Sequence, residues 1–536
     1  MLFGNEVADV LAVLRKTRKT YNDYLPEEAI RLGTEMADKV GGIWEGIREE
    51  IVGLVREEIP YEYPYVAVWW YSVLLGIRKE PSIFSEFVSY IRKHEGVFSP
   101  NTLYFLYYQL SAMIFSNIGL NCSKNKVNLW KFFLEIVGQF EGYIDNTGIL
   151  EELPIERRDR SKILVITEQF LVEEHGPTKT ALDRCRAIIE GMGKDVLLIN
   201  SAELLTRVGE IPFYACCGGS YIPKRKAEKE QFWKGVRVPY YQCENNMPDI
   251  ETVRQLLLEI RAMAPWQAVA IGSGGILGSL VGKIVPSISI GTVPSELAIT
   301  GMRLQTLGRK LEKQDIEILS HMGLSQENVI ESVFTSGLRA QTGHVTREEL
   351  GIPEDTFLLA VVGGRLDNEV TEEFLEILGQ IMPGNMCIGF FGMFHTYESR
   401  TGKFVQLRGK TRNFGFCEDM LSYMEVCDLY INPLRKGGGT SCVEALFKGV
   451  PVVTVDYGDV AVNAGELFCV GDYKGMQKEI MRYYSNKAYY QEMSIKARER
   501  AEVLLDTDTE FAKVMQEAEK RGQIWWEREA RADAKV

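Results

Sequence analysis

Residues 428–457, DLYINPLRKGGGTSCVEALFKGVPVVTVDY, contain one complete strand–helix–strand unit. LYINPL is a short apolar run that ends in a glycine-rich turn, TSCVEALFKG has the apolar spacing of a helix, and VPVVTV is rich in β-branched residues. Near-continuous apolar strands separated by helices are typical of a parallel sheet buried on both faces. The stretch therefore predicts an α/β fold that binds its ligand at the carboxyl ends of the strands.

The same alternation extends in both directions along the chain. It forms two successive groups of strands and predicts two tandem Rossmann-like domains, over 160–345 and 346–505, followed by a C-terminal helix over 506–536. The strands expected in the first group are 162–167, 194–200, 268–275 and 287–294. Those expected in the second are 357–366, 386–394, a short strand within 404–427, 429–434 and 450–458. Two such domains leave a deep cleft between them, which is the expected ligand site.

Residues 1–155 differ in composition, being rich in aromatic residues and poor in glycine. Apolar residues recur at helical spacing over 6–16 and 34–59, which predicts an all-helical domain. A charged linker with a proline, 151–162, separates it from the first strand. The uncharged stretch 101–123 contains glutamine, asparagine and several tyrosines, so we read it as a buried core helix and not as a membrane span.

The chain has 536 residues, a net charge of −13 and ten cysteines. The excess of acidic residues argues against binding to nucleic acid or anionic lipid through the overall charge of the protein. The cysteines lack paired metal-ligand spacing, and we expect them to be reduced thiols in the cytoplasm. Glu6 and Asp9 interrupt the apolar start of the chain, so we expect no signal peptide and no transmembrane segment.

The loop after LYINPL joins two cations to three glycines. Arg435 and Lys436 precede the glycines, and Thr440-Ser441 begins the helix. Glycines let backbone amides approach a ligand and a helix N-terminus adds partial positive charge, so the loop predicts a site for a phosphate or diphosphate. The alternative is a flexible glycine turn with Thr440 as the helix cap. Glu444 is either a ribose ligand or an ordinary acid in the first turns of the helix.

Four further turns are expected at or near strand ends. Gly363-Gly364-Arg365 ends the first strand of the second domain, where an arginine can clamp a phosphate. His175-Gly176 in the first domain offers a general base or a group that steers the sugar, and Ser273-Gly274 offers an oxygen-binding turn. His395 is a second histidine candidate, in the second domain. The alternatives are loop histidines without chemistry and, at Ser273-Gly274, close packing of helix on strand.

Three blocks of the second half resemble the nucleotide-sugar-binding domain of GT-B glycosyltransferases of the family-4 type. They are VVGGRL, NFGFCEDMLSYMEVCDLYINP and GGGTSCVEALFKGVPVVTVDYGDV. The resemblance implies that Arg365 and a basic partner grip the donor diphosphate, that Gly415-Phe416 lies near the nucleobase and that Glu444 binds the ribose. Lys436 stands where that family carries an acid, and the family's lysine shortly after the arginine is missing, so we expect Lys436 to supply the second positive charge.

The resemblance implies a glycosyltransferase that moves a sugar from a nucleotide-sugar to an acceptor hydroxyl or amide on a glycan or protein. No Asp-x-Asp motif stands at a strand end, so we expect no metal and no cofactor. We expect His175, Arg365 and Lys436 to be catalytic and His175, Gly176, Ser273 and Gly274 to lie on the acceptor side. The residues expected on the donor are Gly363, Gly364, Arg365, His395, Gly415, Phe416, Arg435, Lys436, Gly437, Gly438, Gly439, Thr440, Ser441 and Glu444.

Several alternatives stay open on the same fold. They are a sugar-nucleotide epimerase, a glycan phosphorylase, for which no Schiff-base lysine is identified, and a catalytically silent subunit that chaperones a partner transferase. Helices ahead of a GT-B pair also resemble cytoplasmic glycosyltransferases that modify bacterial adhesins on asparagine. We therefore expect the helical domain to recognise the acceptor or a partner, or to form homo- or hetero-oligomers. It carries no phosphate-binding turn, so we do not expect it to bind donor.

Overall fold

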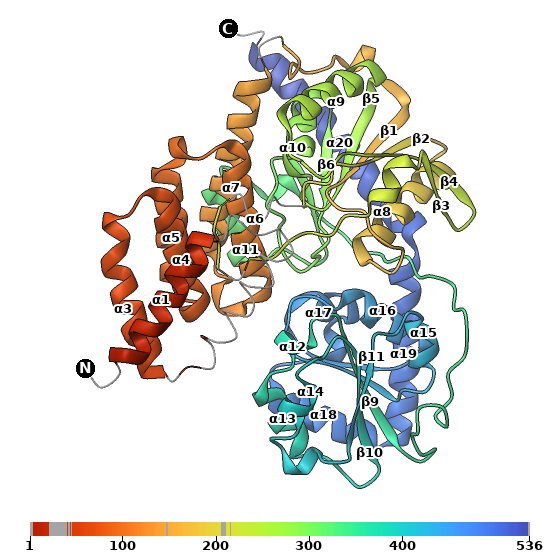
Figure 1. Ribbon diagram of the computed structural model, residues 1–536. Helices are drawn as coiled ribbons and strands as arrows, with labels where there is room; N and C mark the ends of the chain where they lie inside the picture. The colour runs from red at the N-terminus through yellow and green to blue at the C-terminus, as the bar shows by residue number, and fades with distance from the viewer. Residues whose placement is uncertain are drawn as a thin grey trace.

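The computed structural model describes residues 4–20, 40, 43, 45–145, 148–204, 211–214 and 216–533. They form an N-terminal group of helices and two α/β domains, each built on its own sheet (Figure 1). The predicted fold class, two tandem Rossmann-like domains preceded by helices, is confirmed. The first half of the helix predicted over 34–59 falls mostly outside the described residues.

The N-terminal helices pack beside the first sheet domain (Figure 1). They are α1 (Gly4–Thr20), α3 (Glu45–Glu58), α4 (Pro64–Arg78), α5 (Pro81–Lys93), α6 (Pro100–Ser116) and α7 (Ser123–Ile144). Proline opens α4, α5 and α6, where its missing N–H leaves no bond unmade. Trp69 and Trp70 are fully buried, and α6 buries nine of its 17 residues, so the uncharged stretch forms a core helix as predicted, over 101–116.

No helix within the described ranges is both long and apolar enough to cross a membrane. All ten cysteines lie in the described part of the chain, and each is a free thiol.

The first domain is joined to the helices by direct contacts as well as by the chain. Trp130 Nε1 of α7 donates to Thr300 O at 2.8 Å, and the Gln109 side chain of α6 bonds both backbone polar groups of Cys217.

The first sheet has the strand order β3-β4-β2-β1-β5-β6-β7-β8, parallel except for the β3–β4 hairpin. The strands are β1 (Asp159–Thr167), β2 (Asp195–Asn200), β3 (Glu230–Trp233), β4 (Val236–Gln242), β5 (Pro265–Ile271), β6 (Ser287–Ile290), β7 (Leu304–Leu307) and β8 (Val329–Glu331). The helices are α8 (Gly176–Arg186), α9 (Ile250–Met263), α10 (Gly275–Ile284) and α11 (Lys313–His321). The order reverses at β1 and β5, and such a switch point opens a crevice at the carboxyl ends.

The second sheet has the order β11-β10-β9-β12-β13-β14 and is parallel throughout. The strands are β9 (Phe357–Gly363), β10 (Met386–Gly392), β11 (Thr411–Gly415), β12 (Leu429–Asn432), β13 (Val452–Val455) and β14 (Cys469–Val470). The helices are α12 (Leu366–Glu369), α13 (Glu372–Gly379), α14 (Tyr397–Thr401), α15 (Met420–Met424), α16 (Gly439–Lys448), α17 (Gly458–Ala464), α18 (Tyr473–Ser485) and α19 (Lys487–Leu505). Its switch point lies between β9 and β12, where Arg365 and the glycine loop follow their strands.

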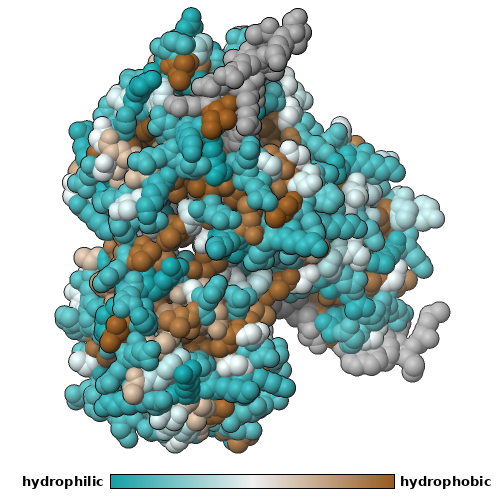
Figure 2. All heavy atoms as spheres, turned by 180° about the vertical axis from the view of Figure 1, so that it is seen from behind, coloured by the Kyte–Doolittle hydropathy of each residue, from teal (hydrophilic) through white to brown (hydrophobic). Residues whose placement is uncertain are grey.

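The C-terminal helix α20 (Thr507–Asp533) leaves the second domain and returns to the first (Figure 1). Phe511, Val514 and Met515 lie in the same buried cluster as strands β1, β2 and β5. Thr507 Oγ1 donates to Asp183 Oδ2 of α8 at 2.6 Å. The chain therefore connects the two domains twice. Figure 2 shows the reverse face, where hydrophobic side chains gather around the junction of the two domains.

The nine predicted strands are present, the short one within 404–427 being β11, but β3, β4, β7, β8 and β14 were not predicted. The last three have only two to four residues, too few to show a periodic pattern. The β3–β4 hairpin has the alternating burial of an exposed sheet edge, and its turn at Lys234-Gly235 has positive φ at both residues. That alternation was a usable signal.

Candidate donor and acceptor cleft

A cleft of about 640 Å³ opens where the carboxyl ends of the two sheets meet. The first domain contributes loops after β1 and β6, and the second contributes loops after β9, β10, β11 and β12. The helical domain contributes Phe115, at the end of α6. The predicted site residues that line this cleft are His175, Gly363, Gly364, Arg365, Phe416, Arg435, Gly437, Gly438, Gly439, Thr440, Ser441 and Glu444.

The glycine loop places the N-terminus of α16 at the floor of the cleft. Gly438 is the N-cap residue, with φ +99°, a left-handed conformation that L side chains rarely adopt. A Cβ there would also lie only 2.6 Å from Arg435 Nη2. Gly438 has no side chain that could cap this end of α16, and the residues that begin the helix line the cleft with their first N–H groups. Backbone amides at a helix N-terminus form a site for an anion.

Two arginines flank that helix end and share one carboxylate. Arg435 is buried, and its Nη1 donates to Glu369 Oε2 at 2.6 Å while Nη2 donates to Val362 O. Arg365 is half exposed, and its Nη2 donates to Glu369 Oε1 at 2.9 Å. Glu369 therefore links the two cations, and a phosphate entering the cleft would compete with it for their N–H groups.

Glu444 and His175 face the cleft from opposite domains. Lys179 Nζ, one turn into α8, lies 3.5 Å from Glu444 Oε1, and both side chains are largely buried. Burial raises the pKa of Glu444, and the charge of Lys179 opposes that shift. Burial, and next the charge of Lys179, lowers the pKa of His175 to about 4. His175 is therefore a neutral imidazole at pH 7, and its Nδ1 lies 3.1 Å from Thr178 Oγ1.

The remaining cleft residues complete its rim. Phe416 follows Gly415 at the end of β11 and is 63% exposed, so its ring is open to a flat partner. Gly176 and Gly415 do not themselves line the cleft. A Cβ on Gly176 would lie 3.1 Å from Thr440 Oγ1, so the N-termini of α8 and α16 lie close together. Burial raises the pKa of Asp459, at the back of the cleft, to about 7 despite hydrogen bonds from Ser295.

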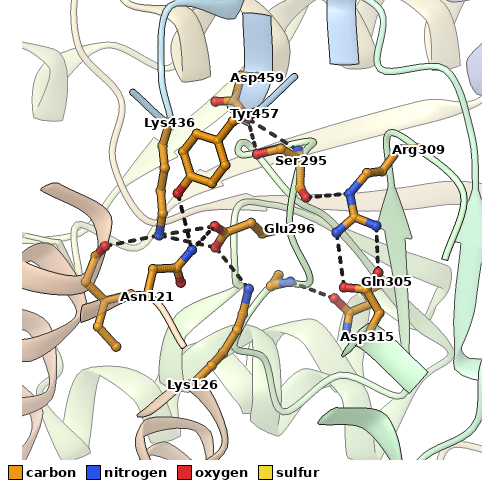
Figure 3. Close-up of polar contacts among 12 residues, drawn as sticks. Asn121, Lys126, Ser295, Glu296, Gln305, Arg309, Asp315, Lys436, Tyr457 and Asp459 are labelled. Atoms are coloured by element: carbon orange, nitrogen blue, oxygen red, sulfur yellow. Dashed lines mark hydrogen bonds and ion pairs between the residues drawn. The ribbon is translucent and has the colours of Figure 1, made fainter. Parts of the chain in front are cut away.

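Lys436 does not lie where the sequence analysis placed it. Its side chain is 4% exposed, and Nζ donates to Ile114 O at 3.1 Å and to Glu296 Oε2 at 3.3 Å (Figure 3). Arg435 lines the cleft, whereas Lys436, the next residue in the same loop, does not. The expected contact of Lys436 with a diphosphate is corrected: the second cation of the cleft is Arg435.

Ser273-Gly274 is not an open turn on the acceptor side. Glu168 Oε2 accepts from the Ser273 and Gly274 N–H groups at 2.9 and 3.2 Å, and Glu203 accepts from Ile276 and Leu277 N. Two buried carboxylates of the chain itself thus accept the hydrogen bonds at the N-terminus of α10 that a sugar oxygen would need, and the turn does not line the cleft. That expectation is corrected.

His395 also lies outside the residues that line the cleft. Its Nδ1 is 2.9 Å from Asp367 Oδ2, and its side chain is exposed. The contact orders the start of α14, because Asp367 also accepts from Thr396 N and Oγ1. The structure therefore gives His395 a role in a surface turn in place of the predicted donor contact.

Glu369, Lys179 and Phe115 are among the cleft residues that sequence reasoning missed. Glu369 follows Arg365 by four residues, the spacing of a helical ion pair, which was a usable signal. Lys179 follows His175 by four residues on the same helix, but its partner lies in the other domain. Phe115 had no local signal at all. Within the described ranges no three His, Cys, Asp or Glu side chains gather as a metal site would require.

Two Rossmann-like domains that face each other across such a cleft define the GT-B fold, which this chain has. No protein-family model and no curated protein sequence matches it. Among solved structures, a mutant form of the O-GlcNAc transferase of Thermobaculum terrenum aligns with a TM-score of 0.54 and 11% identity, over 96% of this chain and 98% of that one. A glycosyltransferase from Rickettsia africae aligns with a TM-score of 0.50 and 10% identity, over 68% of this chain and 99% of that one. At such identities the likeness shows the fold, and the family-4 type stays a prediction.

Proposed function

We propose that the protein is a glycosyltransferase that moves a sugar from a nucleotide-sugar to an acceptor on a glycan or protein. One observation carries the proposal. The uncapped N-terminus of α16 opens into the cleft beside two arginines, with Glu444 one turn further along the same helix. This arrangement supports the binding of a nucleoside diphosphate, with its phosphates on the amides and arginines and its ribose diol on the carboxylate.

Each donor-side group has a part in the chemistry. As the bond between sugar and phosphate breaks, negative charge develops on the leaving diphosphate. Arg365 and Arg435 neutralise that charge, with some of their N–H groups exchanging Glu369 for the diphosphate as hydrogen-bond acceptor. The amides of Gly439 and Thr440 add further hydrogen bonds. These fixed groups stabilise a leaving diphosphate without a metal or a cofactor, which is the mode we propose. The exposed ring of Phe416 offers a stacking surface for the nucleobase.

The first domain supplies the acceptor side. His175 is neutral at pH 7, so its ring can accept a proton from an acceptor group or hydrogen-bond to the sugar. The name of the Thermobaculum neighbour makes N-acetylglucosamine and an oxygen acceptor the first pair to test. We assign acceptor or partner recognition, and any homo- or hetero-oligomer contact, to the helical domain, where Tyr61 and Tyr63 are almost fully exposed. The free thiols support a cytoplasmic location.

The proposal is tested with a panel of nucleotide-sugars, beginning with donors of N-acetylglucosamine. Saturation-transfer NMR identifies the donor, and slow hydrolysis of that donor distinguishes a transferase from a silent binding subunit. Arg365→Met should weaken donor binding about 10- to 100-fold, the worth of a charge-assisted contact. Arg482→Met, on the outer helix α18, is the matched control and should bind donor as the wild type does. A wild-type protein that binds no member of the panel contradicts the proposal.

A further inference from the structure

The end of helix α6 lies against the anion-binding loop. The Phe115 ring is 4.8 Å from Arg365 Cζ, measured to the ring centroid, and 6.0 Å from Lys436 Nζ. A Cβ placed on Gly437 would lie 3.8 Å from Phe115 Cζ. A side chain of the helical domain thus lines the proposed donor site beside Arg365, which is more exposed than Arg435.

Buried contacts hold this helix end in place. Lys436 Nζ binds Ile114 O, the carbonyl just before Phe115, and is also 3.2 Å from Glu296 Oε1 (Figure 3). Glu296 in turn accepts from Lys126 Nζ at 3.0 Å and Asn121 Nδ2 at 2.6 Å, both from the helical domain. Lys436 therefore joins the loop that carries Arg435 to the residue that precedes Phe115.

Arg365 makes contacts of two different kinds. Its N–H groups bind Glu369, and its Cζ lies over the Phe115 ring, 4.8 Å from the centroid. A diphosphate needs those N–H groups and therefore competes with Glu369. It does not compete with Phe115, because a cation–π contact uses the face of the guanidinium and leaves its edges open.

We propose that Phe115 is a positioning residue of the donor site, whose ring holds the Arg365 guanidinium at the wall of the cleft while its N–H groups bind the diphosphate. The inference rests on the proposed function. It makes the helical domain part of the donor site, in contrast to the expectation from sequence that this domain takes no part in donor binding. Changes in the helices can then alter donor affinity through α6.

The test measures the binding of inorganic pyrophosphate by calorimetry. Phe115→Leu keeps an apolar side chain but removes the ring, and affinity should fall roughly 2- to 30-fold, the range of a cation–π contact. Phe115→Tyr keeps the ring and should bind as the wild type does. The matched control is Phe447→Leu, which removes a ring whose centroid is 5.9 Å from Lys448 Nζ. Phe447 lies in the domain that holds Arg365 but does not line the cleft, so this variant should leave the affinity unchanged.

The same variants are then made in an Arg365→Met background. If the ring acts through Arg365, Phe115→Leu should cause no further loss there. A further loss of the same size, an equal loss in Phe115→Tyr, or wild-type affinity in Phe115→Leu each overturns the inference. If the wild type binds pyrophosphate but Phe115→Leu is unaffected, only this inference fails. If the wild type binds neither pyrophosphate nor any nucleotide-sugar, the proposed function fails with it.

Discussion

Glu296 lies in a buried seam where the helical domain and the two sheet domains meet (Figure 3). Its substitution tests how much the ion pairs of this seam stabilise the fold. Burial raises its pKa, but the charges of Lys126 and Lys436 outweigh burial and hold the pKa at about 2. The carboxylate is therefore ionised between two lysines whose side chains are only 10% and 3% exposed.

The magnitude follows from what each substitution leaves unpaired. Glu296→Gln leaves two buried ammonium groups without a counter-ion, and should lower the free energy of unfolding by about 3–5 kcal/mol. Lys436→Met leaves the Lys126–Glu296 pair intact and removes hydrogen bonds to Glu296 and Ile114 O, which should cost about 1–3 kcal/mol. In the double variant only Lys126 lacks a partner, so its loss should fall below the sum of the single losses by about 1–3 kcal/mol.

The assay is urea unfolding followed by circular dichroism, with all three variants compared with the wild type. Glu372 and Lys403 form an exposed ion pair in the second domain, and the same cycle there should give a coupling of about 0–1 kcal/mol. Strictly additive losses in the Glu296–Lys436 cycle would refute this reasoning, as would a larger loss in Lys436→Met than in Glu296→Gln.

Three more predictions concern the cleft. The folded pKa of Asp459, about 7, lies above 3.8, the ordinary pKa of an aspartate side chain, so the folded state holds a proton that the unfolded chain releases at lower pH. Stability should therefore fall as pH rises between those values, by at most about 4 kcal/mol at ~1.4 kcal/mol per pKa unit, and thermal unfolding of Asp459→Asn should lack this fall. Glu444→Gln should weaken binding of the matching nucleoside diphosphate about 10-fold and leave pyrophosphate binding no weaker, because only the former carries a ribose; equal losses for both ligands would exclude a ribose contact. Transfer activity should persist in EDTA, and a loss restored by magnesium or manganese would show a metal requirement.

Local patterns in the sequence were enough to predict most of both sheets and the anion-binding loop. The strands β1, β5, β9 and β12 are buried on both faces, so their apolar runs are continuous and easy to recognise. The glycine loop was predictable for a similar reason. A left-handed residue at Gly438 and the start of α16 are properties of a few neighbouring residues.

The direction and the partner of each side chain depended on contacts between distant segments. Arg435 and Lys436 are adjacent and carry the same charge, yet one faces the cleft and the other a seam with the helical domain. Glu168 and Glu203 close the Ser273 turn from positions far earlier in the chain. No local spacing predicts such partners.

The chain's pattern of apolar residues and glycines thus determines two sheets, a cleft between them and a place for an anion, because burial and backbone conformation act over short stretches. Only the packed structure decides which charges reach the cleft, since that depends on which segments of three domains meet there. Phe115 shows this most clearly, because an aromatic residue at the end of a buried helix becomes part of the proposed donor site only through the docking of α6 on the second domain.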